Sequence, residues 1–422
     1  MHRNATYRNA FVKLALAGAV LTAGTTSAWA QMDTASCLSN LRRNAPANGV
    51  SQADFDQYTV GAQVLETTVA AAKGQPEGKE TWWDYIAKTV DDQRVEEGRR
   101  ILGDFNMQLS AIGQAYSVDQ EALVAIFGIE TNFGTQLGKI KVLDAWITRA
   151  CTEKNPLWAK NAYASVRLIR DGIVNPDTFI GSWSGAFGMT QFIPTSFYEL
   201  AADGDGDGRI DLYNSLPDAL ASTANHLLKR RARWTRTLDS IIEVRVPDAV
   251  KAGIPSAVDS EFSGSGDRRP IGQWSAQGVT RVTGQPLAPE AFARTQAYLF
   301  APTGSQGPIF LATENFDAIL HYNQSRKYAL AVSLLLNRLK GEPALVTPWP
   351  TDDPGLSRVE IKELQTLLQQ RGYDVGTPDG IPGTMTRNAV RAEQEAMGVP
   401  TDGRVGRKIL DAVRQRVANP AT

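Results

Sequence analysis

Histidine and cysteine are scarce in this chain, and their scarcity narrows the chemistry open to it. The 422 residues include only 3 histidines and 2 cysteines. Zinc sites in proteins are usually built from clusters of these two residue types, and a serine nucleophile needs a well-placed histidine as its base. The composition therefore argues against both kinds of site, and we expect any catalysis to depend on carboxylates.

The chain also lacks a surplus of positive charge and a long apolar run. Its 44 Lys+Arg and 45 Asp+Glu give a formal net charge of −1, so no basic excess exists to bind nucleic acid by counterion release. The apolar run at residues 14–23 is too short to span a bilayer, and no later stretch is long and apolar enough. A content of 42% hydrophobic and 21% charged residues is globular, and the length predicts two or three domains.

Residues 1–30 have the pattern of an export signal. Positive residues precede the apolar run, and a small-x-small cleavage pattern ends at Ala30, which makes Gln31 the expected new N-terminus. No cysteine follows the run directly, which argues against a lipid anchor. The sequence predicts an exported protein with no transmembrane anchor after cleavage; an uncleaved membrane anchor is the alternative.

The two cysteines, Cys37 and Cys151, both lie beyond the expected cleavage site. Two cysteines in an oxidising compartment can pair. We predict a disulfide that ties the first mature helix to the middle of the domain, and two buried free thiols are the alternative.

The rest of the chain divides into segments of different character. Residues 31–339 are predicted to be mainly helical, with one helical pattern over 95–114 and another helix that begins near Asp119. Residues 247–285 are rich in Gly, Ser and short β-prone runs and predict a small β-containing insertion. The proline-rich segment 342–355 predicts a linker, and 359–417 a compact unit of short helices.

Glu130 is the first candidate for chemistry, because it ends a strongly apolar helical segment, residues 124–129. A carboxyl group held among apolar side chains has a raised pKa and can act as an acid near neutral pH. The alternative is a glutamate at a helix end that points into solvent.

The block Gly181–Ser196 combines glycines with aromatic and polar residues. Glycine lets a backbone approach a ligand closely, Ser182 and Gln191 offer hydrogen bonds, and Trp183 and Phe187 offer flat apolar faces. This mixture suits a sugar, although a tightly packed loop beside a helix would have the same composition.

A run of aspartates between residues 203 and 214 matches the spacing of a calcium loop. Acids stand at loop positions 1, 3, 5 and 9, a glycine stands at the sharp turn, and Asn214 replaces the usual bidentate Glu at position 12. We predict a structural calcium ion, and a solvated acidic turn is the alternative. The candidate ligands are Asp203, Asp205, Asp207, Arg209 through its carbonyl, Asp211, Asn214 and, just beyond the loop, Asp218.

Two further aromatic groups complete the motifs. Tyr322, Asn323 and Tyr328 stand at the start of a predicted helix, and Tyr85 belongs to an aromatic cluster, residues 81–85, in a loop-like stretch. Taken alone, either group is best interpreted as ordinary core packing.

Together and in this order, the motifs resemble the membrane-bound lytic murein transglycosylase B family, including its soluble exported members. The matching segments are Trp82–Tyr85, Gly128–Thr131, the Gly181–Ser196 block, the Asp203 loop, Ala224-Asn225 and Tyr322–Val332, which cover nearly all of residues 35–340. The resemblance implies an α+β, mainly α fold: a lysozyme-like domain at 31–341 with helical additions and a small β-containing insertion.

The family also implies residue roles. Glu130 matches the single catalytic acid and base, and Tyr85, Ser182, Gln191, Tyr322, Asn323 and Tyr328 match substrate-binding groups of the cleft. Glu130 would protonate the oxygen between N-acetylmuramic acid and N-acetylglucosamine and then deprotonate the muramoyl 6-hydroxyl, which closes a 1,6-anhydro ring without water. No cofactor is expected for catalysis. A hydrolytic muramidase and a non-catalytic wall-binding protein are the alternatives.

The C-terminal residues 356–418 resemble the small three-helix peptidoglycan-binding domain, on Ile361–Gln365, Gly372-Tyr373, Pro378–Gly383, Gln394 and Asp402-Gly403. Glu393 replaces the aromatic residue that usually precedes Gln394. An inert spacer is the alternative. The expected location is the periplasm, the expected partners are glycan strands, and other cell-wall enzymes are further candidate partners.

Two departures concern the cleft. The segment 146–154 lacks the adjacent arginine pair of some relatives, and Arg149 or Lys154 is the expected substitute. His226 stands where relatives often carry Tyr.

Overall fold

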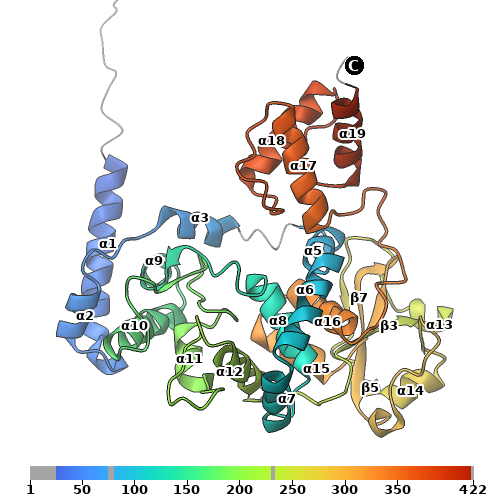
Figure 1. Cartoon of the computed structure of the whole chain (residues 1–422), viewed down its shortest axis with the longest axis horizontal. Helices are drawn as coiled ribbons and strands as arrows, with labels where there is room; N and C mark the ends of the chain where they lie inside the picture. The colour runs from blue at the N-terminus through green and yellow to red at the C-terminus, as the bar shows by residue number, and fades with distance from the viewer. Residues whose placement is uncertain (1–24, 75–79, 230–232, 420–422) are drawn as a thin grey trace, which may run out of the picture.

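The computed structural model describes residues 25–74, 80–229 and 233–419 (Figure 1). Most of the predicted export signal, residues 1–24, lies outside this range, and helix α1 begins at Thr25. Within the described residues, none of the helices combines the length and the apolar character that crossing a bilayer would require.

One helical layer surrounds the Gly-rich block. Its buried centre includes Trp146, Phe187 and Phe197, and the short strands β1 and β2 pair antiparallel beside it. The elements are α1 (Thr25–Asn44), η1 (Pro46–Asn48), α2 (Gln52–Tyr58), α3 (Glu66–Gly74), β1 (Ile140–Lys141), α9 (Val142–Thr152), α10 (Pro156–Arg170), β2 (Ile180–Gly181) and α11 (Pro194–Leu200).

A second group of helices packs around α8, whose residues 122–128 are all buried. The group consists of α5 (Trp82–Thr89), α6 (Asp92–Asp104), α7 (Asn106–Ala115), α8 (Gln120–Thr131), α12 (Leu216–Lys229), α15 (Glu314–Tyr322) and α16 (Arg326–Leu339). Helix α16 runs against α8 and brings its own buried face, residues 328–336, into the same core.

Three local expectations were wrong in this region. The predicted helix over 95–114 is two helices, because Phe105 has φ −111° and both ends α6 and begins α7. Residues 82–85 are helical rather than loop-like, since the Thr81 hydroxyl accepts a hydrogen bond from Asp84 N and caps α5. Tyr322 and Asn323 end α15 instead of starting a helix.

The β-containing insertion is larger than predicted and spans residues 241–312. Its antiparallel sheet has the order β4-β7-β8-β3-β6, with β5 paired to β7. The elements are β3 (Ile241–Arg245), α13 (Asp248–Lys251), β4 (Phe262–Ser263), β5 (Arg269–Pro270), α14 (Ile271–Ala276), β6 (Thr280–Arg281), η2 (Glu290–Phe292), β7 (Gln296–Ser305) and β8 (Ile309–Ala312). Sequence analysis missed β7 and β8 because both are buried on two faces and show no polar alternation.

The C-terminal unit is the predicted bundle of three short helices, α17 (Arg358–Gln370), α18 (Thr384–Ala396) and α19 (Arg407–Ala418). Ser357 and Glu360 form a capping box that begins α17. Glu393 is fully buried and pairs with the guanidinium groups of Arg371 (2.7 Å) and Arg416 (3.1 Å). Two arginines therefore compensate the charge that replaces the usual aromatic residue.

The segment 342–355 connects the two units and packs closely on the larger one. The Glu243 carboxylate of β3 accepts hydrogen bonds from the backbone N–H groups of Val346 (2.9 Å) and Thr347 (2.7 Å). Leu345 and Trp349 pack against the core around α8. The linker is thus a strap held on the surface, and the C-terminal unit lies above α5 (Figure 1).

Candidate active site

Glu130 lies in the last turn of α8, half-buried at the end of the buried apolar run. The Tyr328 hydroxyl, from the first turn of α16, donates a hydrogen bond to Glu130 Oε1 at 2.6 Å. This bond fixes the orientation of the carboxyl group. A solvated helix-end glutamate, the alternative that the sequence left open, would not have a buried phenol as its partner.

Tyr322 and Tyr328 form a parallel pair beside Glu130, with ring centroids 6.5 Å apart and planes 3° apart. Tyr322 donates a hydrogen bond to the Thr190 carbonyl at 2.6 Å. Burial, and then the nearby Glu130 carboxylate, raise the pKa of both phenols above the ordinary value of 10. Both hydroxyls therefore stay protonated at neutral pH and act as donors.

Two backbone carbonyls of the Gly-rich block accept hydrogen bonds from neighbours of Glu130. Besides the bond to Thr190, the buried Thr131 hydroxyl donates to the Met189 carbonyl at 2.6 Å. Two glycines make the turn tight: a Cβ on Gly185 would lie 2.4 Å from Trp146 Nε1, and one on Gly188 would lie 2.8 Å from Leu212. The helix end and the block are thereby held together.

The polar residues of the block are ordered by local bonds. The Ser182 and Ser184 hydroxyls lie 2.9 Å apart, and Ala186 N donates to Ser182 Oγ at 3.2 Å. Gln191 has a positive φ of 53°, and its amide donates to the Gly188 carbonyl at 3.0 Å. Phe187 is 1% exposed and belongs to the core, so it does not offer the open apolar face that the sequence suggested.

The other two predicted substrate-binding residues, Tyr85 and Asn323, come from α5 and from the end of α15. Tyr85 is buried on α5 in the same core as Tyr328, and its proximity contributes to the raised pKa of the Tyr328 hydroxyl. Asn323, half-buried, follows α15 directly, and its backbone N–H donates to Ile319 O. The segment 322–328 therefore turns back to bring both tyrosines to Glu130.

Two of the residues at the departures from the family pattern lie near other residues of the site: Arg149 bonds the Ser184 carbonyl, and His226 lies beside Tyr322. The Arg149 guanidinium lies 3.8 Å from the Trp158 ring centroid and bonds Glu153 Oε1 at 2.8 Å, while Lys154 is exposed. The His226 ring is buried, with its centroid 4.4 Å from that of Tyr322. His226 thus backs one member of the tyrosine pair.

The Asp203 loop gathers some of its carboxylates at one point. Oxygens of Asp203, Asp205 and Asp218 all lie within 4.8 Å of one another. Asp218 is 1% exposed and accepts from Gly204 N (2.7 Å) and Asp211 N (2.8 Å), so a buried charge closes the loop from the start of α12. Such a set of carboxylate oxygens fits a calcium ion, whose oxygen ligands lie about 2.3–2.6 Å from it.

The remaining predicted ligands are arranged differently. Asp211 accepts bonds from Tyr213 N, Asn214 N and the Asn214 side-chain amide. Asp207 is exposed and accepts from Arg209 N at 2.8 Å. The hydroxyl of Ser215, which sequence reasoning did not select, bonds Asp205 Oδ2 at 2.9 Å.

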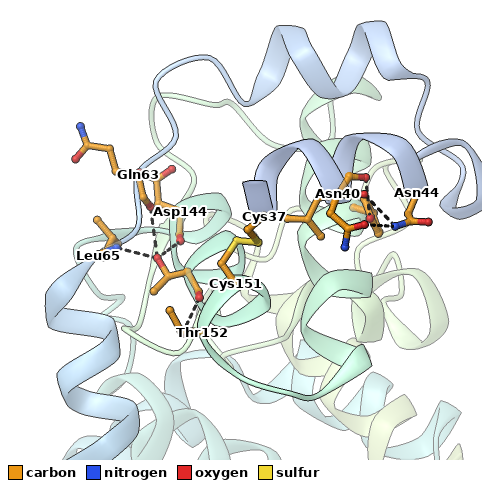
Figure 2. Close-up of a disulfide and its surroundings, with 11 residues drawn as sticks. Cys37, Asn40, Asn44, Gln63, Leu65, Asp144, Cys151 and Thr152 are labelled. Atoms are coloured by element: carbon orange, nitrogen blue, oxygen red, sulfur yellow. Dashed lines mark hydrogen bonds between the residues drawn. A yellow bond between two sulfur atoms is a disulfide. The ribbon is translucent and has the colours of Figure 1, made fainter. Parts of the chain in front are cut away.

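Cys37 and Cys151 are joined in a disulfide, with Cα atoms 5.7 Å apart (Figure 2). The bond links α1 to the end of α9, across 114 residues of sequence. One turn before Cys151 on α9, the Thr148 hydroxyl accepts from Leu65 N at 2.9 Å and donates to the Asp144 carbonyl at 2.7 Å. The N-terminal helix is therefore fixed to the layer that carries the Gly-rich block.

Sequence reasoning gave no role to Thr131 and Asn132, which follow Glu130 directly. Asn132 (φ 49°) and Phe133 (φ 55°) both have left-handed backbones, and Asn132 caps the end of α8. An Asn near a helix end, with a Gly two residues later, is a usable signal for such a cap. Two of the partners of Asn132, Arg94 and Arg358, are distant in sequence and could not have been found this way.

Comparison with known proteins agrees with this geometry. The family model described as "Transglycosylase SLT domain" matches residues 33–337, and a peptidoglycan binding domain model matches residues 357–413. The chain is 28% identical over 272 residues to membrane-bound lytic murein transglycosylase B of Escherichia coli (strain K12), covering 64% of this chain and 70% of that protein.

Two solved structures extend the likeness. SltB3 from Pseudomonas aeruginosa in complex with NAG-anhNAM-pentapeptide is 38% identical, with a TM-score of 0.68 over 90% of this chain and 99% of that one. The Escherichia coli lytic transglycosylase Slt35 in complex with calcium is 25% identical, with a TM-score of 0.57 over 73% and 92%. The fold is therefore that of lysozyme-like lytic transglycosylases with small sheets and an added helical C-terminal domain.

Proposed function

The chain belongs to the transglycosylase SLT domain family and is a peptidoglycan lytic transglycosylase, and we propose that Glu130 is its single catalytic acid and base. The observation that carries the proposal is the hydrogen bond from the buried Tyr328 hydroxyl to Glu130 Oε1 at the end of an apolar helix. The bond orients the carboxyl group for proton transfer to and from the substrate.

The reaction begins with protonated Glu130. Its proton passes to the oxygen that links C1 of N-acetylmuramic acid to N-acetylglucosamine. The C1–O bond then breaks, and N-acetylglucosamine leaves as an alcohol. The carbonyl oxygen of the substrate's own acetamido group stabilises the positive charge at C1. Glu130 is now a carboxylate, with the Tyr328 hydroxyl as a donor to it.

In the second step the Glu130 carboxylate removes the proton of the muramoyl 6-hydroxyl. The 6-oxygen bonds to C1 and releases the acetamido oxygen, which gives a 1,6-anhydro ring and restores protonated Glu130. No water enters and no second carboxylate is needed, in contrast to glycosidases that use a carboxylate pair. Ser182, Gln191, Asn323 and the tyrosines would orient the sugar and its N-acetyl group.

We also propose a structural calcium ion in the Asp203 loop. The buried Asp218 and the convergence of three carboxylates support it, since such charges repel strongly without a cation. The similar Slt35 structure in complex with calcium points the same way. The ion would brace the start of α12 behind the Gly-rich block and would take no part in the chemistry.

The setting of the reaction follows from the substrate. The C-terminal unit would hold glycan strands of the wall, and the periplasm is where an exported enzyme of this kind meets them. The export signal at 1–30 and contacts with other cell-wall enzymes belong to the same proposal.

Digestion of purified sacculi, with product analysis by mass spectrometry, tests the proposed function. Wild type is expected to release anhydro-muropeptides, and Glu130→Gln to release none. Glu121→Gln, on the first turn of the same helix, is the matched control and should behave as wild type. Products one water heavier would establish a hydrolytic muramidase, and unchanged lysis by Glu130→Gln would remove Glu130 from the mechanism.

A further inference from the structure

The C-terminal unit reaches the larger domain through Arg358, the first residue of α17. Its guanidinium forms a two-pronged pair with the buried Asp91, with Nε 2.7 Å from Oδ2 and Nη2 3.0 Å from Oδ1, and Nη2 also lies 3.3 Å from Glu97 Oε2. The remaining nitrogen, Nη1, donates to the side-chain oxygen of Asn132. One arginine therefore connects the C-terminal unit to α6 and to the end of α8.

Asn132 stands two residues after Glu130. Its side-chain oxygen also accepts from Arg94 Nη2 at 3.2 Å, and its amide donates to Thr135 Oγ1 at 2.9 Å. Arg94 is itself buried and bonds the last carbonyls of α5, those of Lys88 and Thr89. Two arginines, one from each domain, thus hold one carboxamide at the C-terminal end of α8, where positive charge is also favourable for the helix dipole.

The backbone at this point needs such support. Asn132 and Phe133 are consecutive residues with positive φ, and this conformation is costly for a bulky residue such as Phe. The Phe133 ring folds back over α8, where a Cβ on Gly128 would approach it to 2.7 Å. A helix end under this strain stays in place only while its neighbours hold it.

Other contacts dock the C-terminal unit without Arg358. Arg404 bonds Asp84 Oδ1 at 2.9 Å. At the end of the strap, next to the unit, Gly355 packs so closely that a Cβ would lie 2.7 Å from the Trp83 carbonyl. The strap is held separately by Glu243. Loss of Arg358 would therefore remove one of the two arginine contacts at the end of α8 while leaving the unit in place.

We propose that Arg358 is a positioning residue, which acts through Asn132 to fix the end of α8 and with it the Glu130 carboxyl. The C-terminal unit then completes the catalytic site in addition to any contact it makes with the wall. This inference rests on the proposed role of Glu130 as acid and base.

The test uses the full chain and a short soluble murein fragment, because cleavage of this substrate does not depend on retention at the wall. Arg358→Met keeps the apolar stem and should lower kcat by about 10- to 100-fold, the cost of a misplaced catalytic group, with KM little changed. Arg414→Met is the matched control, since Arg414 in the same unit bonds Glu363 within that unit. It should leave kcat unchanged.

Asn132→Gly provides the second variant, because glycine accepts the left-handed backbone while removing the carboxamide. It should lower kcat by a similar factor, and the double variant should lose far less than the product of the two single losses, as expected for one shared contact. A fall in melting temperature for Arg358→Met with kcat unchanged would overturn the proposal and leave a structural lock only. Fully multiplicative losses would also overturn it.

Glu130→Gln in the same assay separates the two proposals. If wild type cleaves the fragment and Glu130→Gln does not, the role of Glu130 stands whatever Arg358→Met does. If Glu130→Gln cleaves normally, the role of Glu130 fails, and the positioning argument fails with it.

Discussion

The end of α8 and the Asp203 loop both depend on carboxylates, but they surround them with different partners. Glu130 follows an apolar run and accepts a bond from a buried phenol. In the loop, Asp203 and Asp205 are exposed, lie close to a third carboxylate, and accept bonds from Gly206 N, Gly208 N and Asp207 N. An apolar environment favours a carboxyl that exchanges a proton, whereas convergent carboxylates favour a bound cation.

Exchanging carboxylate for amide in each region should have the largest effect and should separate chemistry from stability. Glu130→Gln is expected to lower kcat by about 10²- to 10⁴-fold, the usual contribution of a general acid or base, with the melting temperature unchanged. Asp205→Asn should do the opposite, lowering the melting temperature in calcium while kcat at a lower temperature stays near wild type. A kcat loss of equal size for Asp205→Asn would break the comparison, because the loop would then act in the chemistry.

The tyrosine pair sharpens the same contrast inside the active site. Tyr328→Phe removes a hydrogen bond to a carboxylate, and Tyr322→Phe removes one of equal length to a backbone carbonyl. Hydrogen bonds to charged groups contribute about 1.5–3 kcal/mol, so Tyr328→Phe should lower kcat roughly 10- to 100-fold. Tyr322→Phe should lower the melting temperature more than kcat. Equal kcat losses in steady-state assays of the two variants would contradict the assigned roles.

Calcium should affect the loop without changing the protonation chemistry of Glu130. An ion that binds only the folded state stabilises it by about 2.7 kcal/mol at a hundredfold excess over its dissociation constant. Melting curves with calcium and with chelator should therefore differ for wild type and for Glu130→Gln. Asp218→Asn should abolish the difference, because Asp218 is the buried member of the carboxylate cluster.

The exposed Asp207 provides the control for that measurement. Asp207→Asn is expected to keep more of the calcium response than Asp218→Asn, because Asp207 lies outside the group of three converging carboxylates. An identical melting temperature of wild type with calcium and with chelator would rule out the proposed calcium ion. If Asp207→Asn lost the whole effect of calcium on the melting temperature, Asp207 would be a ligand, as the spacing of the loop predicts.

Features that depend on residues close together in the sequence were predicted, and features that depend on distant residues were not. The apolar run before Glu130 and the aspartate spacing are local patterns, so both regions could be identified from the sequence. The break between α6 and α7 at Phe105 could not be predicted, because the helical spacing of apolar residues continues across it. The strands β7 and β8 could not be predicted either, because both are buried on two faces and show no polar alternation. Boundaries that depend on burial by other segments are invisible to such patterns.

The contacts of the candidate site were the least predictable part. Tyr328 and Glu130 are 198 residues apart, and Arg358 and Asn132 are 226 apart. The resemblance to a family predicted that Tyr328 and Glu130 belong to the same site. Arg358 lies in a different domain, and no motif connects it to α8. The expected linker was likewise a local inference from prolines, and the structure adds the Glu243 bonds that hold it down.

The smallest expected effect is a change of stability at low pH, and it concerns Asp91, which bonds Arg358 beside the end of α8. Burial alone would raise the pKa of Asp91, but the bond and charge of Arg358 and the backbone N–H and charge of Arg94 outweigh it, so the pKa lies below its ordinary value. The folded protein then binds this proton less tightly than the unfolded chain does. The stability contributed by Asp91 is complete above the unfolded pKa, about 3.9, and is lost as the pH falls through the folded value.

Many carboxylates titrate in the same pH range. The contribution of Asp91 is therefore measured as the difference in stability between wild type and Asp91→Asn. The melting temperature of wild type should exceed that of Asp91→Asn at neutral pH, and the gap should narrow below about pH 4. Glu97, the other acid that faces Arg358, is the control, because its contact is longer at 3.3 Å and its side chain more exposed. The gap for Glu97→Gln should be smaller throughout. A gap for Asp91→Asn that is constant with pH would mean that the charge of Asp91 does not stabilise the junction, since Asn can still cap α6.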